Sequence, residues 1–575
     1  MNLQPGRAGA GPQPPRGAVA LRRVALALLA LAVLNTALSL RNWWPTPGVL
    51  PDLRLAPEFV ALWLLLLALV AWRGALSPRL LTGLSVVYLL LVLGRYADVT
   101  VPALFGRAVN LYWDGQQIPR FLWVSAREYP WWASAAAIAA VLALLTALYL
   151  LLRWALATVA RDAVPYALRA KWTWLPTLLA LAAVAVHQVG AAPALTWHLV
   201  AKPVTPTYVR QALLLGTAFM PGRLAAALPQ APVLAAAMTA APEQALGALR
   251  GRDFKLIFLE SYGAMAFDNP RVAAQLAPAR AQLAADIAAS GNLVASAFVR
   301  ASTFAGASEL SHLSLLSGID LSDPLRHDLL LTSRRPTLTS LFRRAGYQSV
   351  GLYPALSWDW AERAYYGFDL FLDGRDLDYR GPALGYWKIP DQFSLARFDQ
   401  LQPVGPDTPP RFLFFPTITS HLPFGPVPPY QSDWERLLTS DPYGAAESAR
   451  LQTAYVDWLD MLPNYVGMFD YTFRWLGGYL LRPQPRESVM LWVGDHQPAA
   501  SVSGEGASWE VPVHVITRDP ELLARFVALG FRPGLQPQRP ALGGMHDLTA
   551  LLLKAFAAPP AQPARQAAIA PPAFK

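Results

Sequence analysis

Hydrophobic residues follow two different patterns along the chain, and the change falls near residue 250. The N-terminal third contains five long apolar segments, and each is close to the length that crosses a bilayer as a helix. They lie at roughly 22–40, 57–73, 78–96, 131–156 and 172–190. This pattern predicts a transmembrane domain of five helices at 21–190.

Basic residues flank these segments unevenly. Arg22 and Arg23 precede the first segment, Arg73 and Arg79 separate the second from the third, and further basic residues fill 153–171. Cytoplasmic loops carry an excess of Lys and Arg, so we expect these sides to be cytoplasmic. A signal peptide is not expected, because no small-residue cleavage site follows the first segment and four more spans do. Five spans then place the chain after residue 190 outside the cytoplasm.

Short apolar runs alternate with helical patterns after residue 250. Strands are predicted at 254–259, 293–299, 348–353, 411–417, 488–493 and 511–516, and helices at 270–289, 308–317, 336–345, 446–475, 519–529 and 547–556. The alternation predicts a doubly wound α/β domain at 251–558. Residues 191–250, rich in Ala and Pro, are predicted to be interfacial linker helices. Residues 1–20 and 559–575 are predicted to be disordered tails.

Composition agrees with a membrane part joined to a globular part. The 575 residues are 54% hydrophobic and only 15% charged, which is too apolar for one soluble domain. Cysteine is absent, so any metal site must use oxygen and imidazole ligands. The net charge of +10 is dispersed or flanks apolar segments, so we expect it to face a membrane surface and expect no nucleic-acid partner.

Ionisable side chains follow two of the predicted strands. Glu260 ends the run at 254–259, and Asp495 and His496 follow the run at 488–493 after one glycine. Ligands collect at the carboxyl ends of strands in open α/β sheets. Glu260 alone could equally be a helix cap, but the matching pattern at Asp495 and His496 favours a metal site.

A hydroxyl lies where the predicted helix at 308–317 begins. Ser308 follows a loop of small residues and suits an N-cap. A helix N-terminus also stabilises an alkoxide or a phosphate oxygen. If Ser308 were coordinated to a divalent cation, it would lose its proton readily and act as a nucleophile. Thr303 is the alternative nucleophile; Ser308 is favoured because it shares a register with Ser311 and Ser317.

Two further segments complete a family pattern. With TSHLPF at 419–424 and GDH at 494–496, these features resemble the alkaline phosphatase superfamily. Within it, they look most like the membrane enzymes of sulfatase fold: lipoteichoic acid synthase, phosphoglycerol transferases and phosphoethanolamine transferases. The resemblance runs from about residue 20 to 556. It implies a sulfatase-like domain with one or two divalent ions, Zn²⁺ or Mn²⁺, held by Glu260, Ser308, Asp495 and His496, with Ser308 as nucleophile.

The same resemblance implies further site residues. His421, in TSHLPF, matches a histidine that contacts the substrate phosphate, and His546, in GGMHDL, resembles a second active-site histidine of phosphoethanolamine transferases. The segment at 387–393 resembles the one that precedes the substrate histidine. The segment that contains Trp358, Trp360, Glu362 and Arg363 resembles the family segment that holds the lipid headgroup.

Other polar residues have a structural and a functional interpretation. Asn110 and Asp114 lie in an outer, aromatic-rich loop at 97–130, where they either belong to an interfacial anchor or contact a lipid headgroup. His312, one turn after Ser308, is more typical of a helix-surface residue or one behind the ligands than of a metal ligand. His514 alternates within a strand and is predicted to be structural.

The chain departs from the family pattern in two ways. Its predicted nucleophile is serine where the family usually has threonine, and it lacks the disulfides common in phosphoethanolamine transferases.

The function expected from the resemblance is transfer of phosphoglycerol or phosphoethanolamine. The donor would be phosphatidylglycerol or phosphatidylethanolamine, and the acceptor a glycan or lipid outside the bacterial cytoplasmic membrane. One alternative is a catalytically silent, lipid-binding regulator, which would not need a complete metal site. The other is a phosphodiesterase that passes the headgroup to water.

Overall fold

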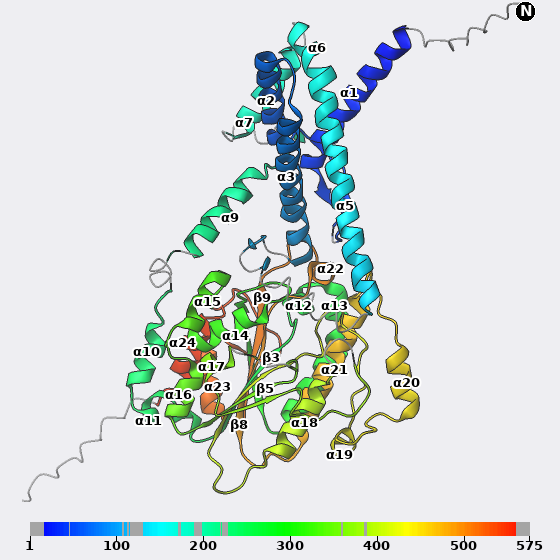
Figure 1. Cartoon of the computed structure of the whole chain (residues 1–575). Helices are drawn as coiled ribbons and strands as arrows, with labels where there is room; N and C mark the ends of the chain where they lie inside the picture. Colours follow the sequence, from blue (N-terminus) through cyan, green and yellow to red (C-terminus); the bar gives the residue numbers. More distant parts are fainter. Residues whose placement is uncertain are drawn as a thin grey trace, which may run out of the picture. The chain divides into compact units, whose positions relative to one another are not determined.

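The computed structural model divides into two compact units, shown in Figure 1. Unit 1 comprises Met1–Leu104 and Ala108–Phe219, and unit 2 comprises Phe105–Arg107 and Met220–Lys575. The structure describes residues 16–44, 46–105, 108–111, 114–115, 130–170, 174–188, 198–218, 220, 228–357, 360, 362–384 and 388–558.

Unit 1 is helical, and each predicted span contains a helix. The helices are α1 (Arg16–Ser39), α2 (Pro57–Arg73), α3 (Pro78–Phe105), α5 (Trp131–Thr158), the π-helical turn η1 (Val159–Ala163), α6 (Val164–Arg169), α7 (Trp174–Gln188) and α9 (Thr205–Ala218). Two short strands, β1 (Arg41–Asn42) and β2 (Val49–Leu50), pair antiparallel between α1 and α2.

Among the residues that the structure describes, three of the five predicted spans have a helix that is long and apolar enough to cross a membrane. Within the described residues these are Leu21–Ser39, Pro78–Leu104 and Trp131–Arg169. The helix α2 has 17 residues, because Pro57 begins it and Gly74, with a positive φ of 74°, ends it. The helix α7 has 15 residues. The structure thus supports a membrane-anchored unit with three candidate spans.

Unit 2 is built on an eight-stranded mixed sheet in the order β10-β4-β9-β8-β3-β7-β5-β6. Its strands are β3 (Asp253–Leu259), β4 (Leu293–Arg300), β5 (Gln348–Tyr353), β6 (Leu370–Asp373), β7 (Arg411–Pro416), β8 (Ser488–Gly494), β9 (Glu510–Thr517) and β10 (Arg532–Pro533). From β8 to β6 neighbouring strands are parallel, whereas β9 runs antiparallel to both β8 and β4. All six predicted strands are present.

Helices cover both faces of this sheet (Figure 1). One face carries α13 (Pro270–Ala289), α18 (Asp391–Leu401) and α21 (Leu462–Leu481), and the other carries α14 (Ser308–Ser317), α16 (Leu338–Arg344), α23 (Pro520–Ala528) and α24 (Asp547–Phe556). Because both faces are covered, every position of β3 is buried. Alternate β3 residues enter different cores: Phe258 packs on one face, and Ile257 on the other.

Shorter helices complete unit 2. They are α10 (Pro232–Thr239), α11 (Pro242–Ala245), η4 (Gly247–Leu249), α12 (Met265–Asp268), α15 (Pro324–Thr332), α17 (Arg363–Tyr366), α19 (Trp434–Leu437), α20 (Ala445–Thr453) and α22 (Ala500–Ser503). The single helix predicted at 446–475 is instead two, α20 and α21, and Pro463 lies in the first turn of the second. A proline is tolerated there but not inside a continuous helix.

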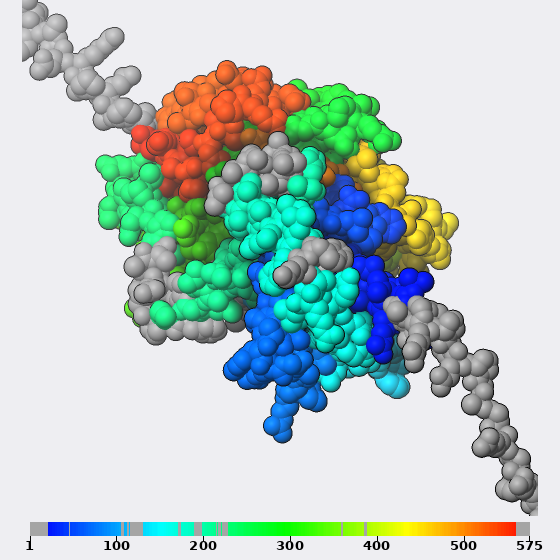
Figure 2. All heavy atoms as spheres, turned by 90° about the horizontal axis from the view of Figure 1, so that it is seen from above, coloured from blue at the N-terminus to red at the C-terminus, as the bar shows by residue number. Residues whose placement is uncertain are grey.

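The segment before β3 packs into unit 2. Leu234 of α10 and Leu249 of η4 are buried in the same core as Phe254 of β3, whereas the sequence pattern groups them with the interfacial linker. The final helix, α24, lies beside the segment that contains α23, as the red and orange spheres of Figure 2 show. Residues that precede β3 and residues of α24 therefore belong to the same hydrophobic core.

Candidate active site

The candidate residues gather at one edge of the sheet because their strands are parallel neighbours. Glu260 follows β3, and Asp495 and His496 follow β8, which pairs with β3 in parallel. The segment Thr417–His421 follows β7, the other parallel neighbour of β3. The carboxyl ends of three adjacent strands therefore meet at this edge.

Two carboxylates and one imidazole converge there. The Nε2 atom of His496 lies 3.5 Å from Oε1 of Glu260 and 3.6 Å from Oδ2 of Asp495. Each residue offers one ligand atom, and these atoms all lie within 4.8 Å of one another. All three side chains are buried. Within the described residues, this is the one group of three or more such side chains able to hold a metal ion.

The Ser308 hydroxyl adjoins this group. Its Oγ atom lies 3.4 Å from Oε2 of Glu260 and 3.2 Å from Nε2 of His496. Ser308 is the first residue of α14, and Ala307, in left-handed conformation with φ of 56°, occupies the N-cap position. The hydroxyl of Thr303 instead donates to the carbonyl of Gly306 at 2.7 Å. The structure thus brings Ser308, and not Thr303, to the carboxylates.

The donor set fits a divalent cation. The Nδ1 atom of His496 lies 2.8 Å from the Gln497 carbonyl, which can only accept, so Nδ1 carries a proton and Nε2 is the ring nitrogen that faces the carboxylates. Burial and the charge of Asp495 raise the pKa of Glu260 well above its usual value. A cation would relieve both the desolvation and the repulsion. Two carboxylates and an imidazole suit Zn²⁺ or Mn²⁺.

Backbone contacts hold the two strand ends together. Ser261, with φ of 58°, donates its N–H to Oδ1 of Asp495 at 2.8 Å and its hydroxyl to Oε1 of Glu260 at 2.8 Å. A Cβ atom at Gly494 would lie 1.9 Å from the Tyr262 carbonyl oxygen. Only glycine therefore allows the β3 and β8 ends to approach this closely.

His421 belongs to a loop fixed by a buried carboxylate. Asp391 accepts hydrogen bonds from the N–H groups of Ile418 at 2.7 Å and Thr419 at 3.0 Å, and its own N–H donates to the Thr419 hydroxyl at 2.8 Å. Burial raises the pKa of Asp391 to about 6. The Nδ1 atom of His421 donates to the Leu422 carbonyl at 2.7 Å, which fixes the orientation of the ring.

The other predicted site residues have different surroundings. Trp360 packs against Tyr353, the last residue of β5, with ring centroids 5.2 Å apart. Exposed Arg363 places its guanidinium 5.6 Å from the ring of Phe371. His546 directly precedes α24, its Nε2 atom 3.5 Å from Oδ1 of Asp547. The described contacts of these three side chains do not reach the metal-ligand candidates, so their roles stay predictions.

Three further predicted positions have no contact with the metal-ligand candidates among the described residues. Asn110 belongs to unit 1, where its N–H donates to the Asp114 carboxylate at 2.9 Å. Trp358 lies outside the described residues. Glu362 immediately precedes α17. A substrate contact by any of them stays a prediction.

Several residues that support the site were not singled out by the sequence patterns. The Thr417 hydroxyl accepts the N–H of Glu260 at 3.0 Å, and the Ser420 hydroxyl donates to the Glu260 carbonyl at 2.7 Å. Gln497 donates to the Ser508 carbonyl at 2.7 Å and accepts the Met265 N–H at 3.3 Å. Their position beside the motifs TSHLPF and GDH is the signal that could have found them.

His312 and His514 are both buried. The ring of His312 packs 4.4 Å from that of Phe258, and neither of its nitrogens has a hydrogen-bond partner. It is therefore not a helix-surface residue, and burial lowers its pKa to about 4. His514 lies between the hydroxyls of Tyr262 at 3.2 Å and Ser296 at 2.6 Å, which agrees with the predicted structural role.

Comparisons with known proteins find similarity in structure. No protein-family model matches the chain, and no curated protein does. An alkaline phosphatase superfamily protein from Vibrio parahaemolyticus is 14% identical with a TM-score of 0.34, over 53% of this chain and 66% of its own. The lipoteichoic acid synthase LtaP from Listeria monocytogenes is 13% identical with a TM-score of 0.32, over 47% and 66%.

A third solved structure is the phosphoglycerol transferase GacH from Streptococcus pyogenes, in complex with sn-glycerol-1-phosphate. It is 12% identical with a TM-score of 0.34, over 57% of this chain and 82% of its own. The chain spans just under two thirds of the length of the first two proteins.

Proposed function

We propose that this chain is a metal-dependent phospholipid headgroup transferase, anchored in the bacterial cytoplasmic membrane with unit 2 outside the cytoplasm. It transfers phosphoglycerol or phosphoethanolamine from phosphatidylglycerol or phosphatidylethanolamine to a glycan or lipid acceptor. One observation carries the proposal: the Ser308 hydroxyl, at the start of α14, lies 3.2 Å from His496 and 3.4 Å from Glu260 in a buried donor set.

Four residues would hold the cation in this proposal. Glu260, Asp495 and His496 supply two carboxylates and a neutral imidazole, and Ser308 supplies the fourth ligand. A bound Zn²⁺ or Mn²⁺ ion provides Lewis acidity, which lowers the pKa of a nearby hydroxyl and offsets charge on a phosphate. The apolar helices of unit 1 keep the chain at the membrane that contains the donor.

Ser308 carries out the first transfer. Its Oγ atom attacks the phosphorus of the lipid phosphodiester, the bond from phosphorus to the diacylglycerol oxygen breaks, and diacylglycerol leaves with a proton. The headgroup phosphate is then linked to Ser308. In the second transfer an acceptor hydroxyl attacks the same phosphorus, and the Ser308 hydroxyl is regenerated with the proton that the acceptor loses.

The surrounding groups assist these transfers. The free N–H groups at the start of α14 stabilise the developing charge on the phosphate oxygens. His421 donates from Nδ1 to the Leu422 carbonyl, and in this proposal its Nε2 atom takes a proton from the attacking hydroxyl and returns it to the leaving oxygen.

The test is intact-mass analysis of the full chain after incubation with each phospholipid and with Zn²⁺ or Mn²⁺. We expect a headgroup-phosphate adduct and released diacylglycerol with the native protein, and neither with Ser308→Ala. Thr303→Ala is the matched control, because that hydroxyl is engaged by Gly306, and it should still form the adduct.

The other outcomes separate the alternatives. Absence of both adduct and diacylglycerol with either lipid would contradict the proposal and favour a lipid-binding regulator. Release of diacylglycerol and of free headgroup phosphate, with no transfer to any hydroxyl acceptor supplied, would identify a phosphodiesterase.

A further inference from the structure

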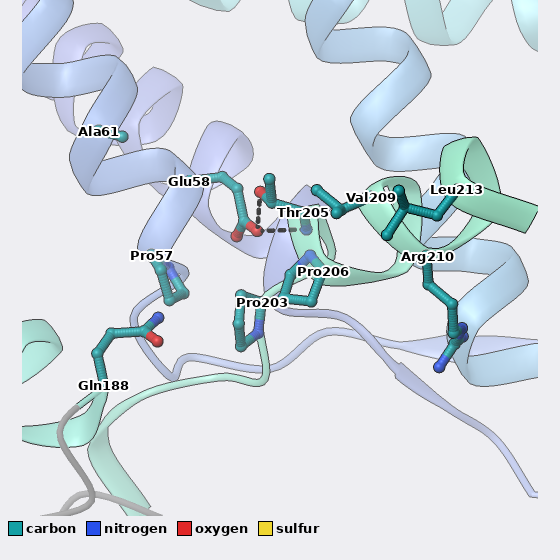
Figure 3. Close-up of a pocket in the computed structure, with 10 residues that line it drawn as sticks. All are labelled: Pro57, Glu58, Ala61, Gln188, Pro203, Thr205, Pro206, Val209, Arg210 and Leu213. Atoms are coloured by element: carbon teal, nitrogen blue, oxygen red, sulfur yellow. Dashed lines mark hydrogen bonds between the residues drawn. The ribbon is translucent and has the colours of Figure 1, made fainter. Parts of the chain in front are cut away.

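A groove of about 690 Å³ lies within unit 1, where α2 begins, α7 ends and α9 begins (Figure 3). Its volume is in the range of ligand pockets, about 300–1,000 Å³. Its lining is mainly apolar: Ala61 of α2, Val209 and Leu213 of α9, and the prolines Pro57, Pro203 and Pro206. The polar side chains around it are those of Glu58, Gln188, Thr205 and Arg210.

The helix α9 is fixed to unit 1 by its other face. The Thr207 hydroxyl donates to the Asp98 carboxylate at 2.9 Å, and the Gln211 amide donates to the Val109 carbonyl at 2.9 Å. The Tyr208 hydroxyl donates to the Leu90 carbonyl. These contacts leave Val209 and Leu213 outward, with exposed fractions of 55% and 68%. The groove wall is therefore held in place by hydrogen bonds elsewhere on the same helix.

Two charged side chains, Glu58 and Arg210, line the groove, and they differ in whether they already have a partner. One carboxylate oxygen of Glu58 accepts the N–H groups of Val204 at 2.8 Å and Thr205 at 2.9 Å, and the Thr205 hydroxyl at 2.7 Å. Figure 3 draws the two Thr205 bonds. Glu58 is thus committed to the start of α9. Exposed Arg210 forms no ion pair with any described residue, so its positive charge is available to a ligand.

We propose that this groove binds one glycerophospholipid, with an acyl chain along Ala61, Val209 and Leu213 and the phosphate at Arg210. Each apolar contact gains free energy from burial, and an arginine at a membrane interface extends its guanidinium to phosphate. The groove lies at the first turn of α2 and the last turn of α7, both apolar helices, and the end of an apolar helix that enters a bilayer lies at the level of the lipid headgroups. This inference concerns lipid binding and does not depend on the chemistry of Ser308.

The experiment is native mass spectrometry of the full chain in detergent, titrated with phosphatidylglycerol or with diacylglycerol. We expect one bound phosphatidylglycerol, held more tightly than diacylglycerol because of the phosphate. Arg210→Gln should weaken phosphatidylglycerol binding about fivefold and remove the preference over diacylglycerol. Ala61→Trp, which fills the groove, should weaken both lipids.

Matched controls use the same substitutions outside the groove. Arg169→Gln changes another exposed arginine of unit 1, and Ala139→Trp adds a ring to an exposed position of α5; both should bind lipid as the native chain does. Equal affinity of the native chain for both lipids, or equal loss in groove and control variants, would overturn the inference. Ser308→Ala should retain the bound lipid, so failure of headgroup transfer is distinguishable from failure of this site.

Discussion

Two carboxylates and one imidazole define the site at the residue scale. The Nε2 atom of His496 and the carboxylates of Glu260 and Asp495 face one another in a buried space, where the two carboxylates repel each other. Such an arrangement is costly unless a proton or a cation neutralises it. The raised pKa of Glu260 expresses that cost, and a divalent cation removes it.

Asp495→Asn tests this balance with little change of shape. Both the Ser261 N–H and the His496 N–H donate to Oδ1 of Asp495, and the asparagine oxygen can accept both. We expect the variant without metal to be at least as stable as the native chain, because one of two like charges is gone. Added Zn²⁺ or Mn²⁺ should raise the unfolding temperature of the native chain and barely change that of the variant.

Thermal unfolding with and without each ion measures the effect. Glu487→Gln is a control, since this exposed carboxylate pairs with Arg252 away from the site. An equal rise for the Asp495 variant and the native chain would contradict the assignment of Asp495 as a ligand.

His514 gives a pH prediction. The Ser296 hydroxyl donates to the Gly534 carbonyl, so His514 donates from Nδ1 to Ser296 and accepts at Nε2 from Tyr262. Burial lowers the pKa of His514 from 6.5 to about 3. The neutral form is stabilised by folding, so its contribution is complete above pH 6.5 and is lost as the pH falls towards 3. The loss is about 1.4 kcal/mol per pH unit.

His514→Gln cannot be protonated and can still form hydrogen bonds. We expect its free energy of unfolding to fall less steeply than that of the native chain between pH 6.5 and 4, as measured by denaturant titration at a series of pH values. Parallel curves for the two proteins would show that His514 does not titrate as its surroundings indicate.

At the scale of elements, the start of α14 combines strain with function. Ala307 has a φ of 56°, which costs a residue with a Cβ about 1–2 kcal/mol. Ala307→Gly should therefore raise the free energy of unfolding by about 1 kcal/mol. Ala285→Gly, at an exposed position inside α13, should lower it by a similar amount. Denaturant midpoints measure both, and a loss of stability in Ala307→Gly would contradict the strain.

The loop after β7 depends on Asp391 of α18. Asp391→Asn retains one acceptor but presents an NH₂ group where two carboxylate oxygens now serve Ile418 and Thr419. Losing a hydrogen bond to a charged acceptor costs about 1.5–3 kcal/mol. We expect adduct formation on Ser308 to slow at least about tenfold, because His421 shifts, while the rise in unfolding temperature with metal is kept. Unchanged adduct kinetics would show that the loop is fixed by other contacts.

The sequence predicts best those strands and helices whose hydrophobic pattern follows directly from which of their residues are buried. The continuous apolar runs at β3 and β8 indicate strands covered on both faces, and each is followed by the ligand candidates at its carboxyl end. The strand β6 has four residues and β10 has two, too few for a pattern. The supporting bonds from Thr417 and Ser420 to Glu260 join different strands, so no local pattern contains them. His312 is buried by Phe258 and Phe414, which lie far from it in the chain.

At the scale of the whole molecule, the residue at which unit 2 begins determines which fragment of the chain can fold without unit 1. The core of unit 2 includes Leu234, Leu246 and Leu249 from before β3, and burying a leucine side chain contributes about 1.5–3 kcal/mol. A fragment of residues 228–558 retains these contacts, whereas one of residues 251–558 exposes the surfaces they cover. We expect the longer fragment to fold with a metal-dependent unfolding temperature, and the shorter one to lose about 5 kcal/mol or fail to fold.

The same pair of fragments separates the chemistry from its delivery. The 228–558 fragment has every residue assigned to the metal and the nucleophile but none of the apolar helices of unit 1, so it should form the Ser308 adduct with short-chain phospholipid dissolved in water. With the same headgroup in a vesicle it should react far more slowly than the full chain, because the membrane anchor no longer concentrates it at the donor. Equal rates on vesicles would mean that unit 1 contributes nothing to donor access.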